Sequence, residues 1–393
     1  MTTPSHGPPG GEAVRIVRTR AVVLDENSTE FEIRELELDE PGVGEVLVRY
    51  VASGLCHSDL HSLDRSITPR LPMVMGHEGS GVVERVGPGV TRLSPGDHVV
   101  CSFVPSCGTC RYCATGRSAL CDLGANALTG LMPNGGFRFH DDAGRDYGAW
   151  CTLGTHAQRA TVPEGSVVKI DPWIPLEVAA LVGCGVPTGW GSALSAGGVG
   201  VGDITVVYGA GGIGVNAIQG AVHGGAKYVI AIDPVAYKRD TALDFGATHV
   251  FATAEDAAEA ITELSWGQGA DQAIVTPGVA HEEIITAAVA AVGKGGTVVL
   301  TAFAGLDVTN IRLRSAEITQ NQKTIKGALF GSLNPHYDIV KLLRLYDAGK
   351  LKLDELVTKR YTMDQVNEGY ADMLEGRIIR GLIIHDTSST MPG

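Results

Sequence analysis

Hydrophobic and polar residues alternate in short segments over the first half of the chain. Three such segments lie at 21–24, 31–36 and 45–52, and two more at 79–86 and 97–100, with Gly/Pro turns between several of them. Alternation with a period of two, interrupted by frequent turns, is typical of short strands. The pattern therefore predicts a β-rich, mostly antiparallel unit in this half.

The pattern changes after about residue 185, where short apolar segments alternate with helical ones. Strands are expected at 204–208 and 228–232, with a helix at 213–222 between them. The alternation continues to the C-terminus, with strands expected at 272–275, 297–301, 324–330 and 381–384 and helices at 282–292, 339–348 and 364–374. Strands that alternate with helices indicate βαβ units and a parallel sheet.

One uncharged stretch has the length of a membrane span. Residues 178–202 carry no charge, but they contain eight glycines and Pro187 and lack a sustained run of large apolar side chains. This composition favours a buried segment over a membrane helix. Residues 1–15 are rich in Pro and Gly, have no apolar core of a signal peptide, and are interpreted as a disordered leader. We therefore expect a cytoplasmic protein with no membrane partner.

Composition narrows the class of protein. The 393 residues suggest two or three domains at ~150 residues each. Lys and Arg number 31 against 44 Asp and Glu, and this net charge of −13 argues against a nucleic-acid binder. The chain has 52 glycines and eight cysteines. In a reducing cytosol, metal binding or catalysis explains the cysteines better than disulfides do.

A glycine turn follows the strand expected at 204–208. Residues 209–214 read Gly-Ala-Gly-Gly-Ile-Gly, and this G-x-G-x-x-G pattern lies between an expected strand and an expected helix. Such turns bind the pyrophosphate of a dinucleotide at the helix N-terminus. Asp233 stands where an acidic residue would bind the adenosine ribose, which favours NAD over NADP. A plain strand–helix turn is the alternative. The turn residues expected to contact the cofactor are Gly209, Gly211, Gly212, Ile213 and Gly214.

Four cysteines lie within fifteen residues, at Cys107, Cys110, Cys113 and Cys121. Four thiolates bind Zn²⁺ tetrahedrally, and a closed shell of this kind is structural. An iron–sulfur cluster is the alternative, but the ferredoxin pattern continues with x3-Cys-Pro, whereas here seven residues intervene and Asp122 follows. The spacing therefore favours zinc.

A more dispersed set consists of Cys56, His77 and Cys184. Spacing does not unite these residues, and a lone buried Cys or His usually belongs to the core. Two cysteines, one histidine and a water nevertheless form a known open, catalytic zinc shell. Asp59 and Glu78 are available as carboxylates that orient the ligands.

In type and order these motifs resemble those of the zinc-dependent medium-chain alcohol dehydrogenases. The resemblance covers about residues 17–385. It rests on the motifs at 54–59, 76–83, 96–99, 107–121, 183–189 and 209–214. It implies an α/β fold with an added β-rich domain: a GroES-like catalytic domain at 1–185 and 331–393, into which a doubly wound Rossmann domain at 186–330 is inserted.

The resemblance also implies a role for each matching residue. Cys56, His77 and Cys184 would hold a catalytic zinc, and the four-cysteine cluster a structural one, so that each subunit binds two zinc ions and NAD. Ser58 would take the alcohol proton and His61 would pass it to solvent. The alternatives are a helix N-cap for Ser58 and a surface position for His61.

Further cofactor contacts follow from the same resemblance. Asp233 and Lys238 would contact the adenosine ribose, His57 and Arg380 would face the pyrophosphate, and Thr188 would press on the nicotinamide. Zinc would favour loss of the alcohol proton as a Lewis acid, and the substrate would then transfer a hydride to NAD.

Other segments resemble particular subgroups of the family. Residues 122–150 form a long insert like that of members active on alcohols and formaldehyde adducts. Residues 331–338 and the chain end resemble a subgroup that retains NAD tightly and is assayed with nitrosoaniline acceptors. The implied reaction is oxidation of a primary alcohol to the aldehyde by a homo-oligomer, a dimer or tetramer, in which residues 324–329 are available for pairing between subunits.

Three alternatives to this function stay open. A thiol-adduct formaldehyde dehydrogenase or a polyol dehydrogenase would share the same motifs. A non-catalytic protein that binds NAD and zinc is the alternative outside enzymes. Phe103 and Trp150 are candidates for an apolar substrate pocket or for the core, and Cys101 and Cys151 are interpreted as core residues.

Overall fold

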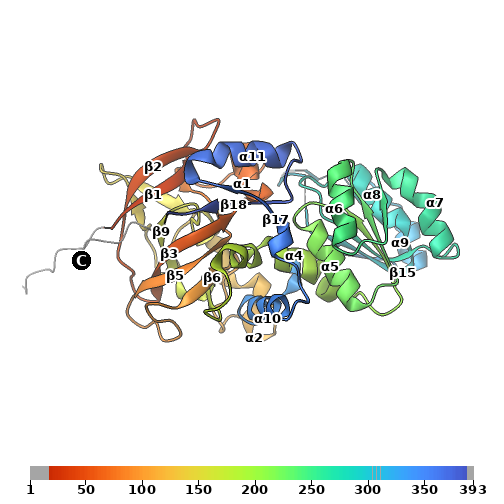
Figure 1. The fold of residues 1–393 in the computed structure, drawn as a ribbon, viewed down its shortest axis with the longest axis horizontal. Coiled ribbons are helices and arrows are strands. Elements are labelled where there is room, and N and C mark those ends of the chain that lie inside the picture. Colours follow the sequence, from red (N-terminus) through yellow and green to blue (C-terminus); the bar gives the residue numbers. More distant parts are fainter. Residues whose placement is uncertain (1–16, 303, 307, 310, 387–393) are drawn as a thin grey trace, which may run out of the picture.

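The computed structural model describes residues 17–302, 304–306, 308–309 and 311–386. A β-rich part and an open α/β sheet lie side by side along the long axis of the molecule (Figure 1). The expected disordered leader falls outside the described residues.

The β-rich part contains a small closed barrel of short strands. In order around the barrel these are β1 (Val17–Leu24), β2 (Glu32–Leu38), β7 (Phe139–His140), β8 (Asp146–Ala149) and β4 (Met73–Val74). Strands β1 and β2 pair antiparallel, whereas β4 and β8 pair parallel. The expected insert at 122–150 therefore contributes two barrel strands, β7 and β8.

A second sheet contains both early and late parts of the chain. Its order is β10 (Val167–Lys169), β6 (His98–Cys101), β5 (Gly79–Val86), β3 (Glu45–Gly54), β18 (Arg380–Ile384) and β17 (Val357–Tyr361), with β9 (Arg159–Pro163) also beside β3. The C-terminal strand β18 pairs antiparallel with β3, so that Leu382 lies opposite Gly54. This pairing brings residues near position 380 next to the segment that carries Cys56.

The α/β sheet is parallel throughout its described pairs. Its order is β13 (His249–Phe251), β12 (Tyr228–Ile232), β11 (Ile204–Tyr208), β14 (Ala270–Val275), β15 (Val292–Leu300) and β16 (Thr324–Gly327). Strand β11 is buried along its whole length, as expected for a strand with helices on both faces. The ranges predicted for β11 and β12, 204–208 and 228–232, agree with the structure at both ends.

Helices cover this sheet and return the chain to the β-rich part (Figure 1). Those around the sheet are α5 (Gly214–Gly224), α6 (Ala236–Asp244), α7 (Ala254–Leu264), α8 (Glu282–Ala291) and α9 (Ser315–Asn321). Those outside it are α1 (His57–Leu63), α2 (Arg111–Ala114), α3 (Leu176–Ala179), α4 (Gly185–Gly191), α10 (Pro335–Asp347) and α11 (Val366–Leu374).

The strand expected at 324–330 is shorter than predicted. It ends at Gly327, and Leu329–Ser332 forms a 3-10 turn instead. Phe330 and Gly331 have φ values of 53° and 62° there, which a strand does not allow. The predicted strand was too long because its apolar residues continue into this turn, where Phe330 is buried in the core just before α10.

The domain limits at 185/186 and 330/331 stay a prediction.

The uncharged stretch forms short helices inside the protein. Helix α4 is buried at every position, and Val186 and Trp190 belong to the same core cluster as Ile218 of α5. Among the described residues, no single helix has the length and apolar content to cross a membrane. One pair, Leu176–Gly183 with Gly185–Ala196, meets those two criteria jointly but is bent by 55°.

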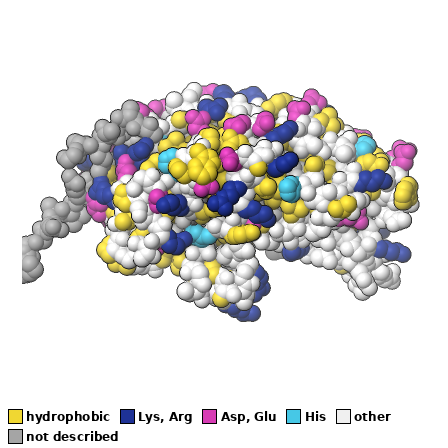
Figure 2. Space-filling view, turned by 60° about the horizontal axis from the view of Figure 1, so that its bottom comes forward, with side chains coloured by type: hydrophobic (Ala, Val, Ile, Leu, Met, Phe, Trp, Pro, Cys, Tyr) yellow, Lys and Arg dark blue, Asp and Glu magenta, His cyan; other side chains and the backbone are white. Residues whose placement is uncertain are grey.

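Figure 2 shows one face of the molecule, on which Lys and Arg side chains lie among Asp and Glu side chains. This face therefore carries charges of both signs.

Candidate active site and metal centres

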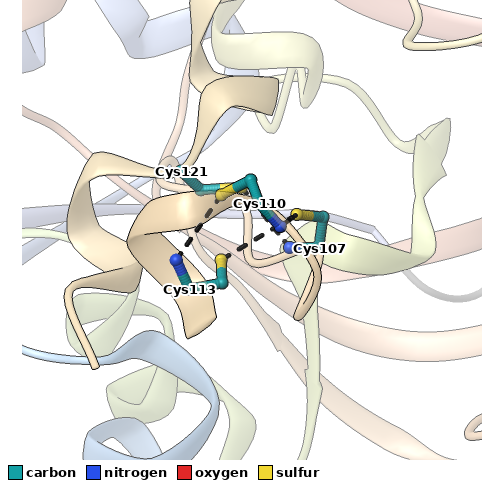
Figure 3. A group of neighbouring side chains, drawn as sticks. All are labelled: Cys107, Cys110, Cys113 and Cys121. Atoms are coloured by element: carbon teal, nitrogen blue, oxygen red, sulfur yellow. Dashed lines mark hydrogen bonds between the residues drawn. The ribbon is translucent and has the colours of Figure 1, made fainter. Parts of the chain in front are cut away.

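The four-cysteine cluster is assembled by one short loop and helix α2 (Figure 3). The Sγ atoms of Cys107 and Cys113 are 3.9 Å apart, and those of Cys110 and Cys121 are 4.0 Å apart. A tetrahedron with Zn–S bonds of about 2.3 Å has edges of roughly 3.8 Å. The four sulfur atoms therefore have the spacing that a tetrahedral zinc site requires.

Backbone N–H groups turn toward these sulfur atoms. Cys107 Sγ accepts from the N–H of Cys110 at 3.2 Å and of Thr109 at 3.4 Å, and Cys121 Sγ accepts from the N–H of Cys107 at 3.4 Å. Burial raises the pKa of the Cys107 thiol, but these N–H groups outweigh it and lower the pKa to about 6. These contacts stabilise the Cys107 thiolate, the form that binds a metal, whereas burial raises the pKa of Cys121 to about 12.

The dispersed set predicted from sequence is brought together where the β-rich part meets the α/β part. Ligand atoms of Cys56, His77 and Cys184, together with a carboxylate oxygen of Glu78, lie within 4.8 Å of one another. All four residues are buried. Cys56 immediately precedes α1 and Cys184 immediately precedes α4, while His77 lies between β4 and β5.

The environment of His77 fits a metal ligand. Its Nδ1 lies 3.3 Å from Asp59 Oδ1, whereas its Nε2 is buried without a hydrogen-bond partner. A buried ring nitrogen left without a partner costs free energy unless another group binds it. The hydrogen bond from the Cys184 thiol lowers the pKa of Cys56 well below its ordinary value. Two sulfur atoms and one free imidazole nitrogen therefore converge as a donor set for zinc.

Glu78 and Arg380 form a buried ion pair beside this set. Arg380 Nη2 binds Glu78 Oε2 and also donates to Leu55 O at 3.1 Å. A Cβ on Gly185 would lie 2.0 Å from Arg380 Nη1, and a Cβ on Gly212 would lie 2.2 Å from Arg380 Cδ. The guanidinium thus lies between the residue that follows Cys184 and the glycine turn. Burial raises the pKa of Glu78 to about 7, against the lowering effect of Arg380.

The glycine turn connects β11 to α5 and fits a dinucleotide. Gly209 has a φ of +88°, and a Cβ on Gly214 would lie 1.8 Å from Gly209 O. By contrast, a Cβ on Gly211 would meet nothing within 4 Å, so the backbone there faces open space. Helix α5 begins at Gly214 without a side-chain cap, and the N–H groups of Val215 and Asn216 donate to Gly211 O and Ile213 O. The positive end of the helix dipole would therefore attract an anion here.

Thr276, at the end of β14, supports this turn and was not found from the sequence. Its hydroxyl lies 2.9 Å from Tyr208 O and 2.8 Å from Gly209 O, as a donor shared between them. A single threonine after a strand carries no signal of this kind, because only the parallel pairing of β11 with β14 brings it to the turn.

Asp233 and Lys238 lie at the predicted edge of the dinucleotide site. Asp233 follows β12 and accepts hydrogen bonds from Ala210 N at 2.8 Å and Val235 N at 2.9 Å. Its carboxylate therefore holds the glycine turn, in addition to any ribose contact. Lys238, on α6, lies near Gly376, whose Cβ position is 3.7 Å from Lys238 Nζ.

The predicted relay residues lie on α1, next to the Cys56 ligand position. Ser58 Oγ is 3.6 Å from Cys56 Sγ, and no side chain caps this helix, so Ser58 is not an N-cap. His61 is 6% exposed and is therefore not a surface residue. Its Nε2 lies 3.1 Å from Gly278 O, across the boundary between the two parts.

The other predicted cofactor residues lie close to the Cys56–His77–Cys184 set or to the α/β part. A Cβ on Gly278 would lie 2.6 Å from the His57 ring, and burial lowers the pKa of His57. Thr188 is buried in α4 and donates its hydroxyl to Cys184 O at 2.7 Å. The contacts of these residues with cofactor and substrate stay predictions.

Of the two aromatic candidates for a substrate pocket, Trp150 lies in the core, whereas Phe103 is partly buried beside His77. The Phe103 ring meets His77 edge-on at 5.7 Å and Phe330 at 5.6 Å. Trp150 is 3% exposed and packs in the cluster that contains Leu55 and Ile67. Cys101 and Cys151 are buried free thiols, in agreement with the prediction.

A separate hollow of about 590 Å³ lies beside the four-cysteine cluster and not beside Cys56. Among its charged side chains, Arg92 lies 3.5 Å from Glu164 and 3.0 Å from His336 Nδ1, and Glu45 pairs with Arg138. These pairs stabilise the wall of the hollow, and the Cys56–His77–Cys184 set and the glycine turn lie elsewhere.

Comparison with known proteins agrees with this geometry. Residues 42–172 match the family described as alcohol dehydrogenase GroES-like domain, and residues 212–348 match zinc-binding dehydrogenase. The NDMA-dependent alcohol dehydrogenase of Amycolatopsis methanolica is 61% identical over 94% of this chain and 99% of its own. The S-(hydroxymethyl)glutathione dehydrogenase of Saccharomyces cerevisiae is 33% identical over 94% of this chain and 97% of its own. The solved structure of benzyl alcohol dehydrogenase from Acinetobacter calcoaceticus has a TM-score of 0.87 and 32% identity, and the match covers 94% of this chain and 100% of that one.

Proposed function

The chain belongs to the zinc-dependent medium-chain alcohol dehydrogenase family, and from this premise we propose that it oxidises a primary alcohol to the aldehyde by transferring a hydride to NAD. The substrate class is a small-molecule alcohol or aldehyde. The family membership accounts for the fold and for the presence of both the zinc donor sets and the glycine turn.

One observation carries the proposal: Arg380 touches both halves of the site. It pairs with Glu78 at the Cys56–His77–Cys184 cluster and lies against Gly212 of the glycine turn. An alcohol at the first and a nicotinamide cofactor at the second would be held side by side, as hydride transfer requires. A structural zinc protein would not need its open donor set beside a dinucleotide turn.

Zinc held by Cys56, His77 and Cys184 supplies Lewis-acid polarisation of the alcohol oxygen when it is bound. Asp59 fixes the His77 ring by its hydrogen bond to Nδ1, which directs Nε2 toward the cluster. Ser58 would accept the alcohol proton, since its hydroxyl lies in the first turn of α1 beside Cys56. His61, one turn later on the same helix, would take the proton onward.

The cofactor would be oriented by the chain's own backbone and charges. The N-terminus of α5 and the turn at 209–214 would bind the pyrophosphate, with His57 and Arg380 beside it. Asp233 and Lys238 would contact the adenosine ribose. Thr188, on α4, would face the nicotinamide. Closure of the two parts around this site would exclude water during the transfer.

The electron acceptor is the finer part of the proposal. The 61% identity to a protein named as an NDMA-dependent alcohol dehydrogenase supports tight retention of NAD and reoxidation by an artificial nitrosoaniline acceptor. The 33% identity to the glutathione-adduct dehydrogenase gives weaker support to a thiol-adduct substrate. We also propose a cytoplasmic homo-oligomer, supported by the eight cysteines that are free thiols and by the exposed edge strand β16.

A single set of measurements tests the function. The chain is purified without added cofactor, its bound nicotinamide is read from the absorbance spectrum and its zinc is counted. Primary alcohols are then screened with added NAD, with NDMA, and with a low-molecular-weight thiol. Two zinc ions per subunit, bound nicotinamide and NDMA-dependent alcohol oxidation are expected. Activity that requires the thiol would favour the adduct dehydrogenase, and absence of any alcohol oxidation would refute the proposal.

A further inference from the structure

A line of hydrogen bonds leads from His61 to the protein surface. His61 Nδ1 lies 2.9 Å from Ser66 Oγ, and Ser66 Oγ lies 2.6 Å from Asp64 Oδ1. The His61 side chain is 8% exposed, whereas that of Asp64 is 60% exposed. His61 Nδ1 also lies 3.9 Å from Asp64 Oδ2, which is too far for a direct hydrogen bond. The buried histidine therefore reaches the solvated carboxylate through the Ser66 hydroxyl.

The direction of these bonds follows from the number of hydrogens available. Ser66 has one hydroxyl hydrogen and two acceptors within reach, Asp64 Oδ1 at 2.6 Å and His61 O at 3.4 Å. The shorter contact, to a carboxylate that can only accept, takes the hydrogen. Ser66 Oγ is then an acceptor for Nδ1–H of His61. The carbonyl oxygen of Gly278, 3.1 Å from Nε2, also only accepts. Both ring nitrogens thus have acceptor partners, and this set of contacts suits the protonated imidazolium.

We propose that Ser66 and Asp64 form the exit by which the proton of the alcohol leaves the buried His61. The inference rests on the proposed function, which delivers a proton to His61. Nδ1–H then passes its proton to Ser66 Oγ as Ser66 passes its own to Asp64, and the Asp64 carboxyl releases a proton to water. One O–H or N–H bond forms for each that breaks, and no electron is transferred.

Local structure holds the three groups in place. Asp64 caps the C-terminal end of α1, and its Oδ1 also accepts from Ser66 N at 2.8 Å. Ser66 O accepts from Leu306 N at 3.4 Å, so the serine is also held from the α/β part. Because two backbone hydrogen bonds fix Ser66, its hydroxyl needs little reorganisation to pass a proton.

The charged and titratable neighbours of this line come from its own segment. His57, on the same helix, has its ring centroid 6.4 Å from that of His61. Arg65 turns away and donates to the carbonyl groups of Asp25 and Glu26. From the α/β part, the uncharged Gly278 carbonyl also contacts His61. Asp64 is the carboxylate that Ser66 joins to His61.

Proton release during a single turnover tests the exit. Holoenzyme is mixed with a primary alcohol in weak buffer, while absorbance reports NADH and a pH indicator reports the proton. Ser66→Ala and Asp64→Asn should slow proton release and kcat about tenfold, with KM for the alcohol changed less than about twofold. This is less than the roughly 10²–10⁴-fold contribution of a general acid or base itself, because His61 is retained and water can replace the missing group. A high concentration of imidazole buffer should restore the rate.

Controls separate this role from a structural one. Glu26→Gln removes a neighbouring exposed carboxylate outside the line and should leave proton release unchanged. Ser66→Thr keeps a hydroxyl and should retain most of the rate if Ser66→Ala folds poorly. In a His61→Gln background, Ser66→Ala should add less than about twofold, because both changes interrupt the same path.

The outcomes are distinct. Proton release at the wild-type rate in Ser66→Ala and Asp64→Asn, in an enzyme that oxidises alcohol, would overturn the exit and leave the proposed function intact. Slow release that imidazole does not restore would also overturn it. A wild-type chain that oxidises no alcohol would overturn the proposed function and this inference with it.

Discussion

Two buried histidines should make the β-rich part sensitive to mild acid. His156 Nδ1 lies 2.8 Å from Ser53 Oγ, and its Nε2 lies 2.9 Å from the Tyr370 hydroxyl. His385 Nε2 lies 3.3 Å from Ser53 Oγ and 3.1 Å from Thr155 O. Burial lowers the pKa of His156 from 6.5 to about 4 and that of His385 to about 3. Both rings are therefore neutral in the folded chain at neutral pH.

The sign of the effect follows from where the protons bind. Below pH 6.5 the unfolded chain takes up a proton at each ring, whereas the folded chain does so only near pH 4 or 3. Protonation thus favours unfolding, and the free energy of unfolding falls as the pH falls from 6.5. One pKa unit corresponds to about 1.4 kcal/mol, so each ring should remove roughly 1.5 kcal/mol between pH 6.5 and about pH 5.

The substitution His385→Gln isolates one of the two contributions. Glutamine keeps an N–H donor for Thr155 O but does not titrate. Urea unfolding at fixed saturating zinc and NAD, measured at several pH values, should show the variant losing roughly 1.5 kcal/mol less than the wild type on acidification to about pH 5. His281→Gln, at an exposed histidine, is the matched control. If the wild type and His385→Gln lose stability in parallel, the buried neutral state of His385 is wrong.

Three further predictions concern the proposed ligands. Cys184→Ala should lower zinc from two per subunit to about one, by metal analysis, because it removes one of three donors of the open site. Cys110→Ser should remove the other zinc and lower the thermal midpoint while the bound nicotinamide spectrum is retained, and an unchanged midpoint would contradict a structural role. Gly214→Ala should weaken NAD binding at least about tenfold in a fluorescence titration, because its Cβ would meet Gly209 O, with zinc content as the control.

Local sequence was sufficient for the features whose residues are close in the chain. Strand β11, the glycine turn and the start of α5 follow one another, and the pattern placed them within about a residue. The four-cysteine cluster lies within one loop, so its spacing alone indicated a tetrahedral site. In these cases the physical constraint acts over a few residues, and the sequence therefore displays it directly.

The open donor set required a different source of information. Cys56, His77 and Cys184 lie in three separate segments, and their union depended on resemblance to a family and not on spacing. The pairing of β3 with β5, together with the burial of α4, brings these segments together. Ser66, Asp64 and Thr276 were missed for the same reason, because a single hydroxyl or carboxylate acquires its role only from its neighbours in space.

Three glycines show how a distant residue determines local composition. Gly54, Gly185 and Gly212 have no left-handed φ, so backbone conformation does not explain them. A Cβ at each would instead lie within 3.0 Å of an Arg380 atom, and a Cβ on Gly54 would also lie 2.2 Å from Glu78, the partner of Arg380. The arginine cannot move away cheaply, since Glu78 would then be a buried carboxylate without its counter-charge. Part of the glycine excess is therefore space for one side chain, which joins the zinc donors to the dinucleotide turn.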